Sequence, residues 1–365
     1  MAGLFGVGSF TGTHPFLLVA LACGLDRLVG DPRWCLHPVV VMGWLISRLR
    51  HLAERLAGDS PWRLRLAGGL ITLLLVGGSA LAGWGLERVA LGVPLCWGLP
   101  ATEPLLPLPV RVLAGLLLLV ALASALAGRS LALAVRSVLA AAQAQDLPLA
   151  RQRLSWIVGR DTEGLDGPEI LRAAAETASE NAVDGLFAPL FWMLVGASLW
   201  SVGALAAPGP LALAWGFKAA STLDSMLGYR RGRLRWLGTA GARLDDLLVW
   251  LPCRLVALGL PLVAGAAPGA AWHQFRAACH DGAPDPSPNA GLSQAAYAHA
   301  VGVQLGGLNH YAGAPRPKPL LAAGQPPADA AAVERMLRLS TRLQLLWLVV
   351  ALALVPLLSK GLRAA

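Results

Sequence analysis

Apolar positions along the chain gather into runs long enough to cross about 30 Å of lipid hydrocarbon. These runs fall near residues 15–30, 66–86, 105–127, 186–206, 247–267 and 343–358. Two long polar stretches, residues 128–183 and 268–342, lie between them. The pattern predicts an all-α, polytopic integral membrane protein with about 5–8 transmembrane or re-entrant helices, plus amphipathic cytoplasmic helices.

A further apolar run, residues 211–227, contains Lys218 and Asp224. Burying either charge in lipid costs several kcal/mol, so this run is expected to face protein or water. A functional or paired role for Lys218 is favoured over a side chain that extends to the membrane interface.

Basic residues predict the sidedness of the first loop. Between residues 48 and 65, five arginines outnumber two acids, which places this loop in the cytoplasm by the positive-inside rule. The later topology stays open. If runs 186–206, 211–227 and 247–267 all cross, residues 268–342 lie outside; if one of them is re-entrant, for example at Pro252, the sidedness inverts.

Composition agrees with a membrane protein. Of 365 residues, 56% are hydrophobic and 14% charged, and the mean hydropathy is +0.58. The net charge of +9 comes from arginines beside apolar runs, which is typical of topology signals, so no nucleic-acid partner is expected. We expect one membrane-embedded domain, residues 1–365, with segments 128–183 and 268–342 contributing to a site.

The stretch RAAAETASENAVDGLFAPLFW, residues 172–192, carries acids into an apolar run. On a helix, Glu176, Glu180 and Asp184 stand at i, i+4 and i+8, and Asn181 lies beside them. Such a face is either solvated, or it binds Mg²⁺ or a cationic substrate at the membrane boundary.

Two shorter stretches carry further charged groups. GDPRWCLHPV, residues 30–39, is either an interfacial turn or a place where Asp31, Arg33 and His37 bind a polar substrate group. VGRDTEGLDGPEI, residues 158–170, predicts a turn followed by a helix start, with Pro168 and Glu169 in the first helical turn. Its Arg160 and Asp161 form either a surface ion pair or a site in which the guanidinium holds a phosphate or carboxylate.

ARLDDLLVWLP, residues 242–252, places Arg243, Asp245 and Asp246 just before an apolar run. Adjacent aspartates point about 100° apart on a helix, so one is able to bind a metal while the other holds the arginine.

The second polar stretch is expected to be a loop rich in Pro, Gly and Asn, followed by a helix near residues 328–342. The loop contains two turn-rich blocks. DPSPNAG, residues 285–291, offers Ser287 and Asn289, and GGLNHYAG, residues 306–313, offers Asn309 and Tyr311. The sequence has no G-x-x-x-x-G-K-[ST] loop, which excludes a P-loop nucleotide site.

Taken together, the ordered blocks GDPRW with HP, VGRDT, ETASENAVDGLFAPLFW, STLDSMLGY, ARLDD with LPCRL, PSPNAG and GGLNHYAG closely resemble the adenosylcobinamide-phosphate synthase (CobD/CbiB) family of cobalamin biosynthesis. Ser221, Val249, Leu308 and His310 depart from the family pattern, which puts amide contacts at 221 and 249 in doubt.

The resemblance implies a multi-pass protein of the bacterial inner (cytoplasmic) membrane with its site on the cytoplasmic side. It implies a reaction that joins the carboxylate of adenosylcobyric acid to the amine of aminopropanol phosphate, or a related amino alcohol, using ATP and Mg²⁺. Expected partners are therefore the corrinoid, the phosphorylated amino alcohol and the lipid bilayer; other cobalamin-pathway enzymes and a homo-oligomer stay open.

On this resemblance, residues are assigned to three roles. The catalytic group is Glu176, Glu180, Lys218, Arg243 and Asp245. The metal group is Glu180, Asp184, Asp245 and Asp246. The substrate-binding group is Asp31, Arg33, His37, Arg160, Asp161, Asn181, Asp224, Ser287, Asn289, Asn309 and Tyr311.

Two other functions compete with the enzyme. Lys218 and Asp224 would suit an ion or substrate path in a transporter, although the large polar stretches argue against one. A non-catalytic scaffold for pathway enzymes would tolerate neutralisation of Asp245 or Lys218.

Overall fold

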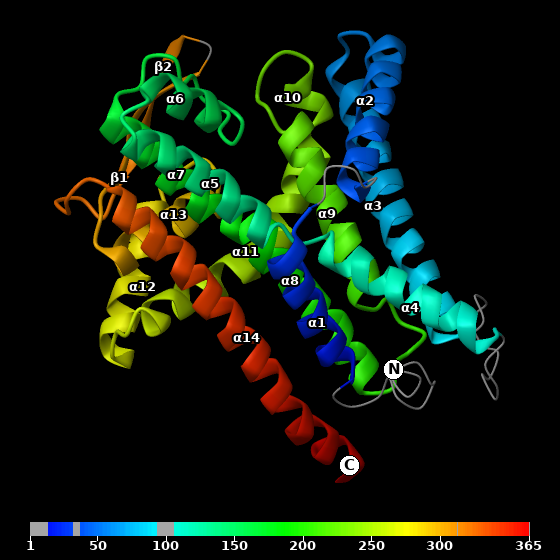
Figure 1. Ribbon diagram of the computed structural model, residues 1–365. Coiled ribbons are helices and arrows are strands. Elements are labelled where there is room, and N and C mark those ends of the chain that lie inside the picture. Colours follow the sequence, from blue (N-terminus) through cyan, green and yellow to red (C-terminus); the bar gives the residue numbers. More distant parts are fainter. Residues whose placement is uncertain (1–13, 32–36, 93–105, 312, 365) are drawn as a thin grey trace. The chain divides into compact units, whose positions relative to one another are not determined.

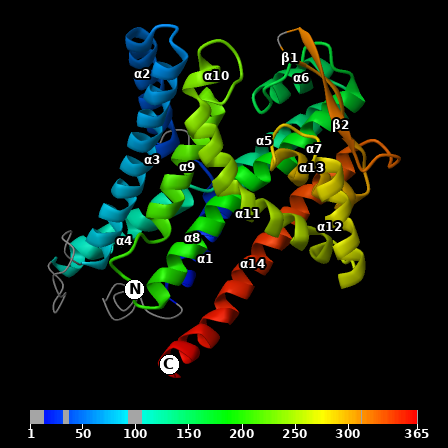
Figure 2. The same cartoon turned by 180° about the vertical axis from the view of Figure 1, so that it is seen from behind.

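The computed structural model describes residues 14–31, 37–92, 106–311 and 313–364, with side chains as far as residue 354. The regular secondary structure of the described chain is helical except for one hairpin and one isolated bridge, and the chain divides into two compact units (Figures 1 and 2). Unit 1 contains Met1–Ala127, Ala188–Leu248 and Leu348–Ala365, and unit 2 contains Gly128–Phe187 and Val249–Trp347. Both long polar stretches of the sequence therefore belong to unit 2.

Unit 1 is built of helices. α3 packs against α2, α4, α9 and α10, and α8 packs against α1 and α9. The bounds are α1 His14–Val29, α2 Pro38–Ala57, α3 Pro61–Leu91, α4 Leu108–Ala123, α8 Ala188–Ser201, α9 Pro210–Leu227 and α10 Leu234–Leu237. α11, Thr239–Val263, begins in this unit, and α14, Ala330–Ala364, ends in it.

α3 and α9 approach closely because small residues line their contact. A Cβ on Gly83 would lie 2.9 Å from the Cα of Ala212. Without a hydrophobic force between helices in lipid, such close backbone packing is a main source of helix association. The same contact brings the buried carboxyl group of Glu87 to the start of α9, where it accepts the N–H groups of Gly209, Leu211 and Ala212 at 3.0, 2.6 and 3.1 Å.

Unit 2 combines helices with the hairpin. Its helices are α5 Gly128–Gln143, α6 Leu147–Ser155, α7 Gly167–Ala182, the π-helical turn η3 Val183–Phe187, α12 Pro268–Gly282 and α13 Ala290–Val301. α5, α6 and α7 pack on one another around buried aliphatic side chains, and α13 contacts α7 and α12.

The hairpin joins β1, Leu305–Tyr311, to β2, Ala314–Leu321, in antiparallel register, with Asn309 opposite Arg316. β1 is irregular between Leu305 and Gly307. There Gly306 has φ +84°, and a Cβ on it would lie 1.9 Å from the carbonyl oxygen of Pro319, so the close approach requires glycine. β1 contacts α7 and α13, and β2 contacts α12 and α13.

Five helical stretches of the described chain are long and apolar enough to cross a membrane: Pro61–Leu91, Leu108–Gln143, Gly167–Ser201, Thr239–Val263 and Ala330–Leu354. α3 exposes large aliphatic side chains along its length, among them Leu66, Leu73 and Leu81, as expected for contact with lipid. The predicted all-α polytopic fold is thus confirmed, with a small hairpin added. α1 is helical where the first run was predicted, but its 16 residues reach only about 24 Å.

Three features differ from the sequence-based picture. α11 continues through Pro252 instead of breaking there. Proline has no N–H to donate to the carbonyl of Leu248, and this carbonyl accepts the indole N–H of Trp192 at 3.2 Å instead. The stretch 268–342, expected to be mostly loop before its last helix, contains α12, α13 and the hairpin. The helix expected near 328–342 and the last apolar run form the single helix α14.

Candidate functional site

α7 carries the acidic face, and its start is fixed locally. Asp166 and Glu169 form a capping box: Asp166 Oδ1 accepts the N–H of Glu169 at 2.9 Å, and Glu169 Oε2 accepts the N–H of Asp166 at 3.1 Å. This reciprocal pair satisfies two otherwise unpaired donors of the first turn. The helix start expected here is confirmed, and it sets the register of Arg172, Glu176 and Glu180.

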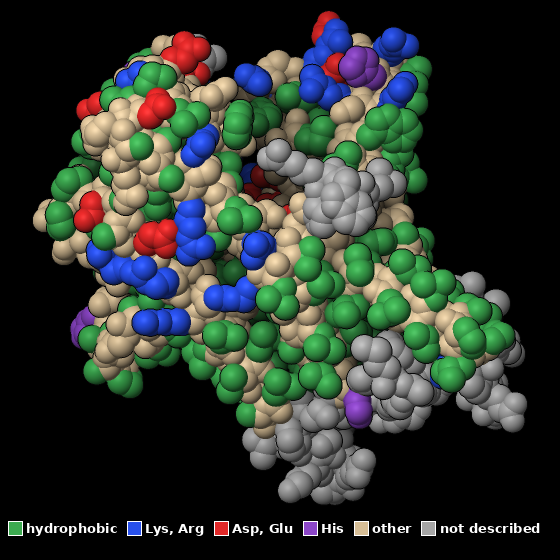
Figure 3. All heavy atoms as spheres, viewed as in Figure 1, with side chains coloured by type: hydrophobic (Ala, Val, Ile, Leu, Met, Phe, Trp, Pro, Cys, Tyr) green, Lys and Arg blue, Asp and Glu red, His purple; other side chains and the backbone are tan. Residues whose placement is uncertain are grey.

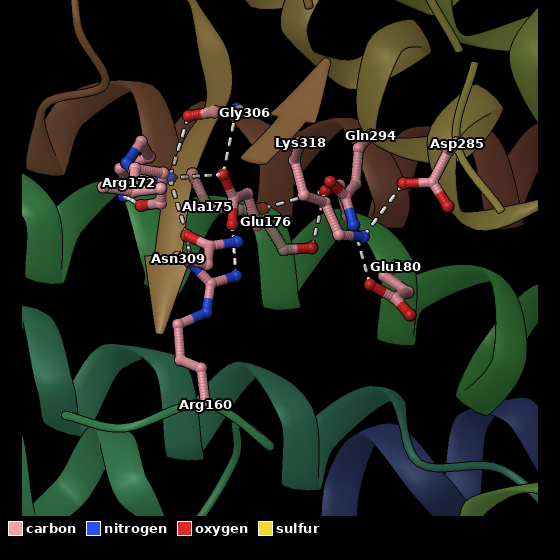
Figure 4. Close-up of polar contacts among 12 residues, drawn as sticks. Arg160, Arg172, Ala175, Glu176, Glu180, Asp285, Gln294, Gly306, Asn309 and Lys318 are labelled. Carbon is pink, nitrogen blue, oxygen red and sulfur yellow. Dashed lines mark hydrogen bonds and ion pairs between the residues drawn. The ribbon is translucent and has the colours of Figure 1, made fainter. Parts of the chain in front are cut away.

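Glu176 is the centre of a buried ion-pair network (Figure 4). Its side chain is 1% exposed, and its Oε2 accepts an N–H of Arg160, whose side chain is 8% exposed. Its Oε1 accepts from Arg172 at 3.2 Å and from the backbone N–H of Gly306 at 3.0 Å. Both carboxylate oxygens are therefore engaged, and Glu176 links the loop before α7, α7 itself and β1 through charge-assisted hydrogen bonds.

The same arginines hold the hairpin through Asn309. Asn309 Oδ1 accepts from Arg160 at 2.7 Å and from Arg172 at 3.0 Å. Arg172 also donates to the carbonyls of Gly306 at 2.8 Å and Leu308 at 2.9 Å. Asn309 is 3% exposed, and its Nδ2 has no hydrogen-bond acceptor among the residues the structure describes.

A second polar group lies one helical turn further along α7. Glu180 is partly buried, and its Oε2 accepts from Gln294 of α13 at 2.7 Å. Lys318 of β2 donates to Asp285 at 2.9 Å (Figure 4). Burial alone would lower the pKa of Lys318, but the carboxylates of Asp285 and Glu180 more than offset this and raise it, so the ammonium form persists.

The block DPSPNAG forms the turn before α13. Asp285 Oδ1 accepts the N–H of Ser287 at 2.9 Å, and Ser287 Oγ accepts the N–H groups of Asn289 and Ala290 at 3.4 and 3.2 Å. Asn289 is buried, and its Oδ1 accepts from Arg254 at 3.3 Å. These contacts hold Asp285 in place beside Lys318.

Asp161 and Tyr311 lie near the tip of the hairpin. Asp161 donates its N–H to the carbonyl of His310 at 2.9 Å and accepts the N–H of Gly313 at 2.7 Å. The ring of Tyr311 lies 5.6 Å from the guanidinium of Arg316. Both predicted residues thus belong to the hairpin end of unit 2.

Asn181 and Asp184 continue the acidic face of α7 and are partly buried. Asp184 stands in η3, and single π-helical turns inside α-helices occur frequently at functional sites. The described residues contain no group of three or more His, Cys, Asp or Glu side chains able to hold a metal ion. The metal assignment stays a prediction.

The other predicted residues belong to unit 1. Lys218 and Asp224 on α9, and Asp245 and Asp246 on α11, are partly buried, whereas Arg243 is exposed. Asp31 lies 3.2 Å from His37, whose Nδ1 accepts the N–H of Val39 at the start of α2. Arg33 lies outside the described residues. The prediction that the residues of both units form one site stays a prediction.

Unit 2 also shows four polar side chains that the sequence assignment missed: Arg172, Asp285, Gln294 and Lys318. Arg172 had a usable signal, because it stands four residues before Glu176 on the same helical face. Lys318 had none, because its partner Asp285 is 33 residues away and the strand that brings them together was not predicted.

The fold is that of a helical, polytopic membrane protein, in which the buried arginine–glutamate network of unit 2 joins a helix to a hairpin. Residues 19–340 match the family model described as CobD/Cbib protein. The chain is 40% identical to the cobalamin biosynthesis protein CobD of Synechocystis sp. over 350 residues, which is 95% of this chain and 94% of the relative. It is 40% identical to CobD of Geobacter metallireducens over 95% of this chain and 99% of the relative, and 35% identical to CbiB of Salmonella typhimurium over 93% and 95%.

The chain belongs to the CobD/CbiB family, as its ordered sequence blocks predicted. The names of its relatives support a role in cobalamin biosynthesis as a pathway enzyme. No solved structure matches the chain.

Proposed function

We propose that this protein is an ATP-dependent amide ligase that joins adenosylcobyric acid to aminopropanol phosphate, or a related amino alcohol, to give adenosylcobinamide phosphate. The observation that carries the proposal is the polar cluster of unit 2, in which a partly buried Glu180 lies beside a protonated Lys318 in a chain of the CobD/CbiB family. Lys318 and its partner Asp285 come from two other elements, and ionisable groups gathered in this way are common at functional sites.

The proposed reaction has two steps. A carboxylate oxygen of the corrinoid attacks the γ-phosphorus of ATP, the bond from that phosphorus to the β–γ bridging oxygen breaks, and ADP leaves. The amine nitrogen then bonds to the carbonyl carbon of the acyl phosphate, the carbon–oxygen bond to phosphate breaks, and phosphate leaves. The amine also loses a proton, so the second step calls for a base.

Glu180 is our candidate for that base. Its Oε2 is engaged by Gln294, and its Oε1 accepts no hydrogen bond from the described residues. Lys318 supplies positive charge next to it, which suits oxygens that gain negative charge as phosphate leaves.

Glu176 and the two arginines around it have a different role in this proposal. Because both oxygens of Glu176 are engaged, we assign it as a positioning residue that fixes Arg160 and Arg172 against β1. The buried Nδ2 of Asn309 has no hydrogen-bond acceptor among the described residues, so it is able to donate to an acceptor atom of a bound substrate.

The donor set is compatible with Mg²⁺ that arrives with ATP. Mg²⁺ is commonly held by one or two carboxylates together with substrate phosphates, rather than by a cage of protein ligands. Asp184, partly buried and four residues beyond Glu180, would hold it in unit 2, and Asp245 is the corresponding acid of unit 1. Glu180 keeps its remaining oxygen for the proton of the amine. When bound, the ion would offset the charge of the phosphate oxygens.

We assign the protein to the bacterial inner membrane with its site on the cytoplasmic side, where ATP is available. For unit 2, the positive-inside rule supports this assignment through the arginines of its segment 128–183, among them Arg129, Arg136, Arg151 and Arg153.

The test uses purified protein in lipid nanodiscs with adenosylcobyric acid, aminopropanol phosphate, ATP and Mg²⁺. We expect the amide product with equal amounts of ADP and phosphate, and a corrinoid hydroxamate when hydroxylamine replaces the amine. Release of AMP would contradict the acyl-phosphate step. Uptake of corrinoid into vesicles without product would favour a transporter and contradict the ligase.

A further inference from the structure

Unit 1 contains a pocket of about 290 Å³. Two of its lining residues, Arg243 and Asp246, carry predicted catalytic and metal roles, and its other lining residues have no assigned role. Four elements build it: the start of α3, the turn after α9, α10 and the start of α11. Its charged lining consists of four arginines and one acid: Arg65, Arg230, Arg235, Arg243 and Asp246. In Figure 3, basic side chains gather at the end of this unit where α2 and α10 lie.

The wall of the pocket is rigid because the backbone of α10 and of the glycine after it packs directly against α3 and the end of α9. A Cβ on Gly68 of α3 would lie 2.0 Å from the carbonyl oxygen of Leu237, and one on Gly238 would lie 1.9 Å from that of Leu227. Beneath, Leu64, Leu227, Leu234 and Leu237 belong to one buried aliphatic cluster. The pocket is therefore part of the folded core of unit 1 rather than a gap between loose side chains.

The arginines are held close together although their charges repel. The guanidinium groups of Arg65 and Arg235 lie 4.4 and 4.8 Å from the centre of the same ring, that of Trp236. Contact with the ring face stabilises each cation but leaves the guanidinium N–H groups available for an anion. All four arginines are exposed at the surface of the pocket, where a ligand reaches them.

The size of the pocket limits the ligand. Its volume lies at the lower end of the range for small-molecule sites and suits a small phosphorylated compound better than a corrinoid. The charge pattern limits it further, because several arginines suit a phosphate group while one aspartate suits an ammonium group.

We infer that this pocket binds the phosphorylated amino alcohol, with its phosphate held by the arginines and its ammonium group by the carboxylate of Asp246. Asp246 then holds the ammonium group in place of the metal ion predicted for it from the sequence. The inference rests on the proposed function, for which it identifies a substrate subsite. The headgroup of phosphatidylethanolamine carries the same two charged groups, so the test separates the soluble substrate from the lipid.

Binding is measured by isothermal titration calorimetry on full-length protein in phosphatidylcholine nanodiscs, with aminopropanol phosphate as the probe. We expect Arg65→Gln and Arg235→Gln each to weaken binding at least tenfold and to leave the affinity for ATP unchanged. The matched control is Arg231→Gln, which removes the same charge from the turn between α9 and α10 but not from the pocket lining. It leaves binding within about twofold.

A second comparison tests the ammonium contact. Asp246→Asn is expected to weaken binding of aminopropanol phosphate several-fold while it leaves the affinity for propanol phosphate, which lacks the amine, unchanged. Equal losses for both compounds would overturn the assignment of Asp246.

The outcomes separate this inference from the ligase proposal. Amide synthesis with an unchanged KM for the phosphorylated amine in the Arg65 and Arg235 variants would overturn the pocket and leave the ligase standing. The expected binding pattern without any amide synthesis would support the pocket and overturn the ligase. If phosphatidylethanolamine nanodiscs abolish binding and the arginine variants lose co-purified phosphatidylethanolamine, the site belongs to the lipid and the inference fails.

Discussion

Glu87 in unit 1 and Glu176 in unit 2 are both buried glutamates, 0% and 1% exposed, whose oxygens are engaged in very different ways. Glu87 accepts three backbone N–H groups from the first turn of one helix, α9. Glu176 accepts from two arginines and from the backbone of a hairpin far away in the sequence. Glu87 satisfies the unpaired N–H groups at the start of α9. Glu176 instead joins the loop before α7, α7 itself and β1, one helical turn from Glu180.

The difference teaches that burial of an acid does not by itself indicate chemistry. A carboxyl group at a helix start satisfies donors that every helix leaves unpaired, which is a structural task. A carboxylate between two arginines, with Glu180 one helical turn further along and Lys318 of β2 near that acid, brings opposite charges from distant segments together, as functional sites commonly do. Substitutions in the two regions should therefore affect different properties.

The largest expected effect is on activity at Glu180. Glu180→Gln keeps the size of the side chain and an acceptor for Gln294 but removes the base, so amide formation should fall by about 10²-fold or more. Turnover is measured in nanodiscs, together with the thermal unfolding temperature, which should stay close to that of the parent protein. Glu163→Gln, an exposed acid before α7, is the control and keeps full activity. Undiminished turnover of the Glu180 variant would remove the acidic face from the mechanism.

The second effect is on stability at Glu87. Glu87→Gln presents an amide N–H₂ to backbone N–H groups at the start of α9, and a buried donor left without an acceptor costs about 1–3 kcal/mol. We expect the unfolding temperature to fall by several degrees while turnover per folded molecule is kept. If turnover falls and the unfolding temperature does not, the distinction drawn between the two regions is wrong.

A smaller, local effect is expected at Arg172. Arg172→Lys keeps the charge but loses the planar fork that reaches the carbonyls of Gly306 and Leu308 together. Amide hydrogen exchange in β1 should become faster. Arg153→Lys, which alters an arginine bound to the carbonyl of Ser137, is the matched control and should leave β1 unchanged. Unaltered exchange in β1 of the Arg172 variant would show that other contacts hold the hairpin.

The smallest effect concerns pH and Lys318. Because its folded-state pKa is raised above the unfolded value, its contribution to stability is fully present below that unfolded value, about 10.4, and is lost as the pH rises through the folded pKa. The unfolding temperature should show no contribution from Lys318 titration between pH 7 and about 9 and should drop at higher pH. The drop should be smaller in Lys318→Gln. A titration of this lysine near neutral pH would contradict its pairing with Asp285.

Sequence patterns predicted the helical elements better than the site. The run containing Pro252 was ambiguous, because proline removes one helical hydrogen bond and the replacement donor, Trp192, comes from another helix. The residues 305–321 were not predicted as strands, since glycines in β1 and three prolines in β2 carry little strand propensity; the hairpin is stabilised instead by contacts with α7, α12 and α13.

The sequence by itself determined the membrane class, the helical content, the start of α7 and the family, because each depends on local hydropathy, local capping or ordered blocks of residues. It also placed Glu176 and Glu180 on one helical face. Only the tertiary structure decided that Glu176 is enclosed by Arg160, Arg172 and the hairpin, and that Lys318 stands beside Asp285. The physical reason is distance along the chain. These partners are 16 to 130 residues apart except for Arg172 and Glu176, and no local periodicity records such contacts.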